Sequence, residues 1–282
     1  PIGELGHEGK QVLKSNSTGL QILESFVTLV DGKIDPKLTA TKYRPRPFFE
    51  GVTLVKDASL LRRLTLSMVG RLPSEIEKQT IEEKGLDALD EVLDQIMKEE
   101  AFYIRLKEGF NDIFLTEGYE GNGELILSYN HFEKSRLWYQ KYNLDHIVDE
   151  KERKETLYSI TRNYRKAIRE EPLELVAYVV RNNKPFTEIL TADYIMVSPY
   201  SARGYGIFEQ IKNRFKDPED PFEYVPARLP ALRARNNNPV NAPLEQESKT
   251  GFYPHAGLLS TFQYLRRYPT TDTNRNRLRA RM

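Results

Sequence analysis

The sequence predicts a mainly α protein, a multi-helix bundle that carries one long Pro- and Asn-rich irregular loop. Two observations support this prediction. Apolar residues recur three and four positions apart in stretch after stretch, which is the spacing of one face of a helix. Prolines and asparagines instead crowd into residues 215–251, where a helix could not continue. With 282 residues and 39% hydrophobic composition, the chain can bury a core without disulfides or a metal.

The first 55 residues are predicted to form an amphipathic helix followed by an extended arm. The helical stripe ends before Asp31 and Gly32 and runs through Leu20, Leu23, Val27 and Val30. Residues 43–49 contain Pro45 and Pro47, which favour extended backbone. We therefore treat 1–55 as a region of its own.

Residues 56–214 are predicted to form the helical bundle. Gly70 is expected to close its first helix and Ser74 to cap the next one. The apolar stripes are Leu60, Leu61, Leu64 and Met68, then Leu86, Leu89, Leu93 and Ile96, then Phe102, Leu106, Phe110 and Phe114. Because the connections between them are short, we expect antiparallel neighbours.

Residues 149–180 are predicted to contain two helices of that bundle. The first runs from Asp149 to Glu171, and the second begins at Pro172, because proline fits the first turn of a helix better than its interior. The inward residues are Leu157, Ile160, Tyr164 and Ile168 in the first helix and Leu173, Val176, Val179 and Val180 in the second.

The rest of the chain divides into the irregular loop, 215–251, and a C-terminal helical segment, 252–282. Residues 275–282 stop within a helix-like pattern that has no cap, so we expect the natural chain to continue past Met282. The chain begins at Pro1, which is expected of a processed or partial polypeptide.

Charge and composition remove several classes of function. Lys and Arg total 42 against 41 for Asp and Glu, so no global field attracts nucleic acid or anionic lipid. The C-terminal arginines at 275, 277, 279 and 281 alternate and would spread around a helix. No apolar run approaches the roughly 20 residues of a membrane span. We expect no nucleic-acid partner and no transmembrane span.

No cofactor and no metal are expected from the motifs of the chain. There is no cysteine, which excludes thiolate zinc sites, iron–sulfur ligation and covalent haem attachment. The four histidines have no ligand spacing, and no serine shows the pattern of a nucleophile elbow. The glycines of residues 117–123 do not form a phosphate-binding loop.

Asp193 is the carboxylate that the sequence singles out, because it lies in a low-charge stretch between apolar residues. A buried acid there would need a partner, and Arg203 is the natural candidate. We favour a structural ion pair over catalysis. The catalytic alternative pairs Asp193 with Glu188 as the two acids of a glycoside hydrolase, which depends on the separation of the two groups.

Three segments resemble bacterial exported domains of unknown function first noticed in planctomycetes. Residues 62–75 resemble the R-R-L-x-L…G-x-x-P opening of that family. Residues 185–194, together with 201–206, resemble its L-L-T-A-D-Y segment. Residues 255–277 resemble a later G-x-L…P-T block, in which arginines follow the proline and threonine.

This resemblance implies an extracytoplasmic location, periplasmic or on the outer surface of a bacterium. Proteins of this type are often fused to c-type cytochrome domains or occur beside them. The resemblance brings no established catalytic residue with it. The chain also lacks the C-x-x-C-H of the members that carry haem.

We therefore expect a non-catalytic binding or scaffold module that docks onto a larger envelope or cytochrome-containing complex. Two alternatives stay open. One is a polysaccharide-active or other hydrolytic enzyme that uses Asp193 and Glu188. The other is a redox subunit whose haem lies on chain not present here. The expected partners are proteins, and a carbohydrate is kept as an alternative ligand.

Overall fold

A computed structural model describes residues 16–32, 53, 55–117, 127, 129–232, 248–269 and 273. These residues are mainly helical, and the strands found among them form one two-stranded sheet, which confirms the predicted fold class. The chain divides into two compact units, Pro1–Val55 and Lys56–Met282. The predicted arm at 43–49 and the arginine-rich stretch at 275–282 lie outside the described residues.

In the first unit, α1 (Thr18–Val30) forms where the apolar stripe predicts it. The Ser17 side chain caps the helix by accepting a hydrogen bond from the Leu20 amide. Gly32 follows the helix with a positive φ of 69°, which glycine adopts without strain. The apolar side chains that lie exposed on α1 include Ile22, Phe26, Leu29 and Val30.

The second unit begins with four helices that pack around one apolar cluster. They are α2 (Asp57–Val69), α3 (Glu75–Lys84), α4 (Leu89–Ile96) and α5 (Glu100–Phe114), with a short 3₁₀ turn, η1 (Gly85–Ala88), before α4. Their buried side chains include Leu61, Val69, Ile81, Val92 and Ile96. Gly70 closes α2 in the left-handed conformation and Ser74 caps α3, so both predicted helix ends are confirmed.

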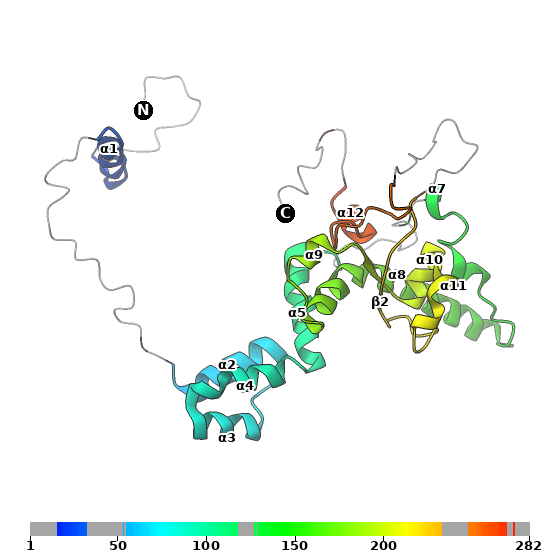
Figure 1. Ribbon diagram of the computed structural model, residues 1–282, viewed down its shortest axis with the longest axis horizontal. Coiled ribbons are helices and arrows are strands. Elements are labelled where there is room, and N and C mark those ends of the chain that lie inside the picture. The colour runs from blue at the N-terminus through cyan, green and yellow to red at the C-terminus, as the bar shows by residue number, and fades with distance from the viewer. Residues whose placement is uncertain are drawn as a thin grey trace. The chain divides into compact units, whose positions relative to one another are not determined.

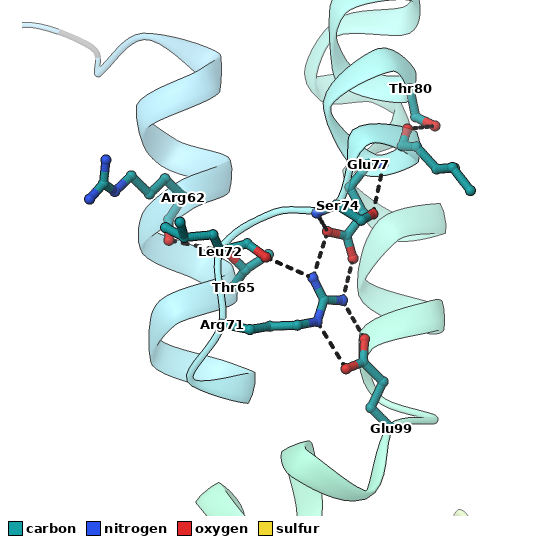
Figure 2. A network of polar contacts seen from close by, with 9 residues as sticks. Arg62, Thr65, Arg71, Leu72, Ser74, Glu77, Thr80 and Glu99 are labelled. Atoms are coloured by element: carbon teal, nitrogen blue, oxygen red, sulfur yellow. Dashed lines mark hydrogen bonds and ion pairs between the residues drawn. The ribbon is translucent and has the colours of Figure 1, made fainter.

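Arg71 fixes the turn between α2 and α3. Its guanidinium donates to both carboxylate oxygens of Glu77, at 2.9 and 2.6 Å, and to both oxygens of Glu99, which precedes α5 (Figure 2). Glu77 also completes a capping box, because the Ser74 amide donates to its carboxylate at 2.7 Å. The hydrogen bonds that Arg71 donates lower the pKa of Glu77, and donation to the two carboxylates raises the pKa of Arg71.

The longest helix, α8 (Glu150–Arg181), runs for 32 residues without a break. The prediction of two helices that meet at Pro172 is therefore wrong. Proline inside a helix removes one hydrogen bond and costs about 3 kcal/mol. Around Pro172, however, the side chains of Leu173, Leu175 and Val176 are fully buried, and burying each large aliphatic side chain contributes roughly 1.5–3 kcal/mol. Packing on several sides of α8 outweighs the local cost.

A small antiparallel sheet packs against α8. Its strands are β1 (Ile195–Val197) and β2 (Val225–Ala227), with Ile195 opposite Ala227 and Val197 opposite Val225. The sequence did not predict these strands, since β2 falls in the stretch interpreted as an irregular loop. Pro226 is tolerated because a two-stranded sheet consists of edge strands only. Residues 233–247 of the predicted loop lie outside the described chain.

Short elements complete the second unit (Figure 1). They are α7 (Tyr129–Phe132), η2 (Trp138–Lys141), α9 (Glu188–Thr191), α10 (Pro199–Tyr205), α11 (Phe208–Ile211), η3 (Lys212–Arg214) and α12 (Phe262–Arg267). In the predicted C-terminal helical segment, 252–282, α12 is the helix found among the described residues. A Cβ at Gly204 would lie 2.2 Å from the Tyr164 hydroxyl, so α10 can approach α8 only with glycine there.

Glu171 and Tyr205 join α8 to α10 through a fully buried hydrogen bond. The Tyr205 hydroxyl donates to Glu171 Oε2 at 2.6 Å, and no solvent reaches the carboxyl group. Burial raises the pKa of Glu171 to about 8, because a charged carboxylate is disfavoured away from water. Glu171 is therefore a neutral acid in the folded protein at pH 7.

The Arg71 network predicts a large loss of stability when its cation is removed. Arg71→Gln leaves the nearly buried Glu77 carboxylate without its charge partner, and we expect the free energy of unfolding to fall by about 2–4 kcal/mol. The matched control is Arg105→Gln, which breaks an exposed pair with Glu108 and should cost less than about 1 kcal/mol. Urea unfolding at pH 7 measures both variants, and equal losses would contradict a structural role for the network.

Glu171 predicts that stability falls as pH rises. The raised pKa means that, between about 4.5 and 8, the folded state holds a proton that the unfolded state has released, so the stabilisation is complete below this window and is lost across it. Glu171→Gln keeps a neutral side chain at every pH. Relative to this variant, the wild type should lose roughly 2–4 kcal/mol between pH 5 and 8. Thermal unfolding of both proteins across this pH range measures the difference. If their stabilities change in parallel with pH, Glu171 is ionised in the folded protein.

Candidate functional site

A cleft of about 480 Å³ lies between α5, α8 and the segment that leads into β2. We call it the charged cleft. Six of its lining side chains are ionisable acids and bases, namely Glu100, Lys107, Lys166, Glu170, Glu174 and Arg181. Tyr178, Met196, Phe222 and Tyr224 are its large apolar and aromatic contributors. The site thus combines both signs of charge with apolar surface.

The charged residues on α8 reach the cleft because of their spacing. Lys166, Glu170 and Glu174 follow one another at intervals of four residues, as does Tyr178. Residues four apart lie one above another on a helix. The unbroken course of α8 through Pro172 keeps all of them on the same face.

The six acids and bases of the charged cleft form three ion pairs, each of one acid with one base. Lys107 Nζ lies 2.6 Å from Glu174 Oε1, with side chains only 25% and 19% exposed. Burial alone would lower the pKa of Lys107, but Glu174 reverses this effect and the net shift is upward. At the two ends, Arg181 pairs with Glu100 at 2.8 Å and Lys166 with Glu170 at 3.5 Å.

Glu170 is the most buried acid of the charged cleft, with a side chain that is 15% exposed. Burial raises its pKa, and Lys166 offsets only part of that effect. The Tyr224 hydroxyl donates to the Ala167 carbonyl at 2.9 Å and lies 3.4 Å from Glu170 Oε2. The Lys166 ammonium lies 4.7 Å from the centre of the Phe222 ring. These contacts tie the segment before β2 to α8.

The sequence-predicted pair of Asp193 and Arg203 does not form, and that prediction is wrong. The Asp193 side chain is 70% exposed and lies 3.6 Å from Arg228 Nε. Arg203 instead pairs with Glu219 at 2.7 Å and stacks 3.9 Å from the Phe208 ring centre. Asp193 occupies the turn between α9 and β1, where its neighbours Ala192 and Ile195 are buried and it points outward.

Glu188 is held as a carboxylate by two neighbours. Lys184 Nζ lies 2.8 Å from Glu188 Oε1, and the Tyr194 hydroxyl donates to the same oxygen at 2.5 Å. These hydrogen bonds lower the pKa of Glu188. None of Glu188, Asp193 and Arg203 lines the charged cleft.

In the described part of the chain, no group of three or more His, Cys, Asp or Glu side chains lies close enough together to hold a metal ion. His255 accepts a hydrogen bond from the Leu229 amide at 2.9 Å through Nε2. Burial lowers the pKa of His255 to about 4, so the ring is neutral at pH 7. Among the described helices, none is long and apolar enough to cross a bilayer.

Comparison with known proteins places part of the chain beside a known family. Residues 130–207 match the family described as PSD4, a protein of unknown function (DUF1592). This segment is thus similar to a bacterial domain of unknown function. It contains seven of the eleven residues that line the charged cleft. Neither the curated proteins nor the solved structures gave a match.

The different environments of Asp193 and Lys107 predict opposite mutational costs. Asp193→Asn removes an exposed, long ion pair, and we expect the free energy of unfolding to change by less than about 0.5 kcal/mol. Lys107→Met leaves Glu174 unpaired in a mostly buried position and should cost about 2 kcal/mol.

Chemical denaturation at pH 7 compares these two variants. Glu174→Gln added to Lys107→Met should recover part of the loss, because no charge is then left without a partner. A large loss for Asp193→Asn would mean that its pairing with Arg228 matters more than its exposure indicates.

Proposed function

We propose that this chain is a non-catalytic binding module and that the charged cleft is where it docks a protein partner. One observation carries the proposal: the paired, mostly desolvated charges of Lys107 and Glu174 in an open cleft. Desolvating two charges costs free energy that their attraction only partly returns, so such a pair is weak support for stability. Its arrangement is better suited to select a ligand of complementary charge pattern.

The length of the charged row fits a polypeptide segment. Between Lys166 and Arg181, α8 advances about 22 Å at 1.5 Å per residue. An extended peptide of about seven residues covers the same distance. Acidic and basic side chains on such a peptide would meet Lys166, Glu170, Lys107 and Glu174 in turn, while Phe222 and Met196 offer apolar contact.

A carbohydrate is the alternative ligand of the same cleft. Hydroxyl groups can donate to the carboxylates and accept from the ammonium groups, and the Phe222 ring offers a flat apolar face. The two ligand classes differ in their response to salt. Binding of a charged peptide weakens as ionic strength rises, whereas binding of a neutral sugar changes little.

The partner complex in this proposal is extracytoplasmic. The exported, cytochrome-associated proteins that the sequence resembles support an envelope location and docking onto a larger complex. The alternative hydrolase would use Asp193 and Glu188, but the lowered pKa of Glu188 makes it a poor general acid. That alternative and the redox subunit with haem on further chain stay predictions from the sequence.

Exchange of the central ion pair tests the proposal. The double variant Lys107→Glu, Glu174→Lys keeps an internal pair but reverses the polarity presented to a ligand. We expect its melting temperature to stay close to that of the wild type and capture of the native partner to fall at least about tenfold, which is 1.4 kcal/mol. The control exchange, Lys84→Glu with Glu91→Lys, reverses an exposed pair outside the cleft.

The measurement is photo-crosslinking in extracts of the native source, with a photoreactive amino acid at Phe222. The same probe at Phe186, which is exposed but does not line the cleft, gives the background. Equal crosslinking for the wild type and the cleft exchange variant would remove the charged cleft as the docking site. Loss of crosslinking on addition of a neutral oligosaccharide, at unchanged low ionic strength, would favour the carbohydrate ligand instead.

A further inference from the structure

A second cavity, of about 670 Å³, lies between α2 and α3 in the second unit. We call it the α2–α3 groove. Leu61 and Ile81 form its buried floor, and Ala58, Leu72 and Pro73 add apolar surface. Ligand pockets of about 300–1,000 Å³ with mostly apolar lining and a few polar groups are typical small-molecule sites.

The Arg71 network holds one wall of this groove in place. The Leu72 carbonyl accepts a hydrogen bond from Arg71 Nη1 at 3.0 Å, while Glu77 fixes the start of α3 (Figure 2). Leu72 is 58% exposed, so an apolar side chain is kept at the groove with much of its surface in water. A preformed wall lowers the ordering cost that a ligand must meet.

The charged residues that line the α2–α3 groove include more cations than anions. Lys56, Arg62 and Lys78 stand against Asp57 and Glu82. Lys78 is within 2.7 Å of Glu75, an exposed acid that does not line the groove. Within the described part of the chain, Lys56 and Arg62 form no ion pair with another residue. An anionic group at the rim therefore complements the local charge.

We propose that the α2–α3 groove binds a small amphiphile, an aliphatic chain with an anionic head group such as a carboxylate. The chain lies over Leu61, Ile81 and Leu72, and the head group meets the ammonium groups of Lys56 and Lys78. This site is independent of the charged cleft, with which it shares no lining residue. It also lies outside the segment that matches a family.

Calorimetric titration of the full chain with octanoate, decanoate and dodecanoate, each below its micelle concentration, tests the proposal. Each added methylene should strengthen binding by about fourfold until the groove is full, which is the worth of a buried CH₂. Decyltrimethylammonium, with one more alkyl carbon and the opposite charge, should still bind at least several-fold more weakly than decanoate. Replacing Lys56 and Lys78 by Gln should remove that preference.

Matched tryptophan variants place the ligand in the groove. Ala58→Trp fills the cavity and should weaken decanoate binding at least tenfold, whereas Ser59→Trp, on the next exposed position of α2, should leave binding within twofold. Leu72→Ser is a milder second variant, with an expected loss of several-fold, should Ala58→Trp disturb the helices. Circular dichroism checks that each variant is folded.

Three outcomes would overturn the proposal. They are no saturable binding of any of the three carboxylates, equal binding by the Ala58→Trp and Ser59→Trp variants, and tighter binding of decyltrimethylammonium than of decanoate. A partner-derived amphipathic helix that binds the groove when no carboxylate does would assign the groove to a protein contact instead.

Discussion

The second unit depends on one constraint, which is that α8 must continue as a single helix through Pro172. Burial on several sides of that proline compensates the hydrogen bond that it cannot make. Because α8 is continuous, one helix joins the apolar cluster around Tyr164 and Ile168 to the cluster around Val176 and Val179. The strand β1 also packs against α8. Because α8 is continuous, the charged residues of α8 at both ends of the charged cleft lie on the same face of the helix.

Three acids in α8 or just after it differ in their ionisation or pairing because their surroundings differ. Glu171 is fully buried with no cation beside it, and the hydrogen bond from Tyr205 offsets only part of the effect of burial, so Glu171 stays protonated. Glu174 finds Lys107 at short distance. Glu188, just beyond the end of α8, finds both a lysine and a tyrosine and is held ionised. Whether a carboxyl group carries charge at pH 7 therefore depends on its burial together with the groups that lie beside it.

Elements that depend on neighbours in the sequence could be predicted, whereas elements that depend on contacts between distant residues could not. The stripes of α1, α2 and α5 and the caps at Gly70 and Ser74 depend on neighbours within one or two turns. The strands β1 and β2 are three residues each and gain their stability from pairing across about thirty positions. The prediction of a helix start at Pro172 was wrong because it considered only the local cost of proline and not the packing around it.

The candidate site shows the same limit. The spacing of Lys166, Glu170 and Glu174 was visible in the sequence as a charged helix face and could have indicated a cleft wall. Lys107 could not be assigned to Glu174, because 67 positions separate them. The choice of Arg203 for Asp193 rested on closeness in sequence, and both side chains found partners elsewhere in the fold.

The proton held by Glu171 has a consequence for how the molecule exchanges ions with its solvent. Counting residues gives a formal charge of +1 at pH 7, and the neutral Glu171 makes the folded chain one unit more positive than that count. Each molecule that unfolds near neutral pH releases this proton. The heat of unfolding will therefore differ between buffers according to their own ionisation enthalpies, as it would for an enzyme that liberates acid.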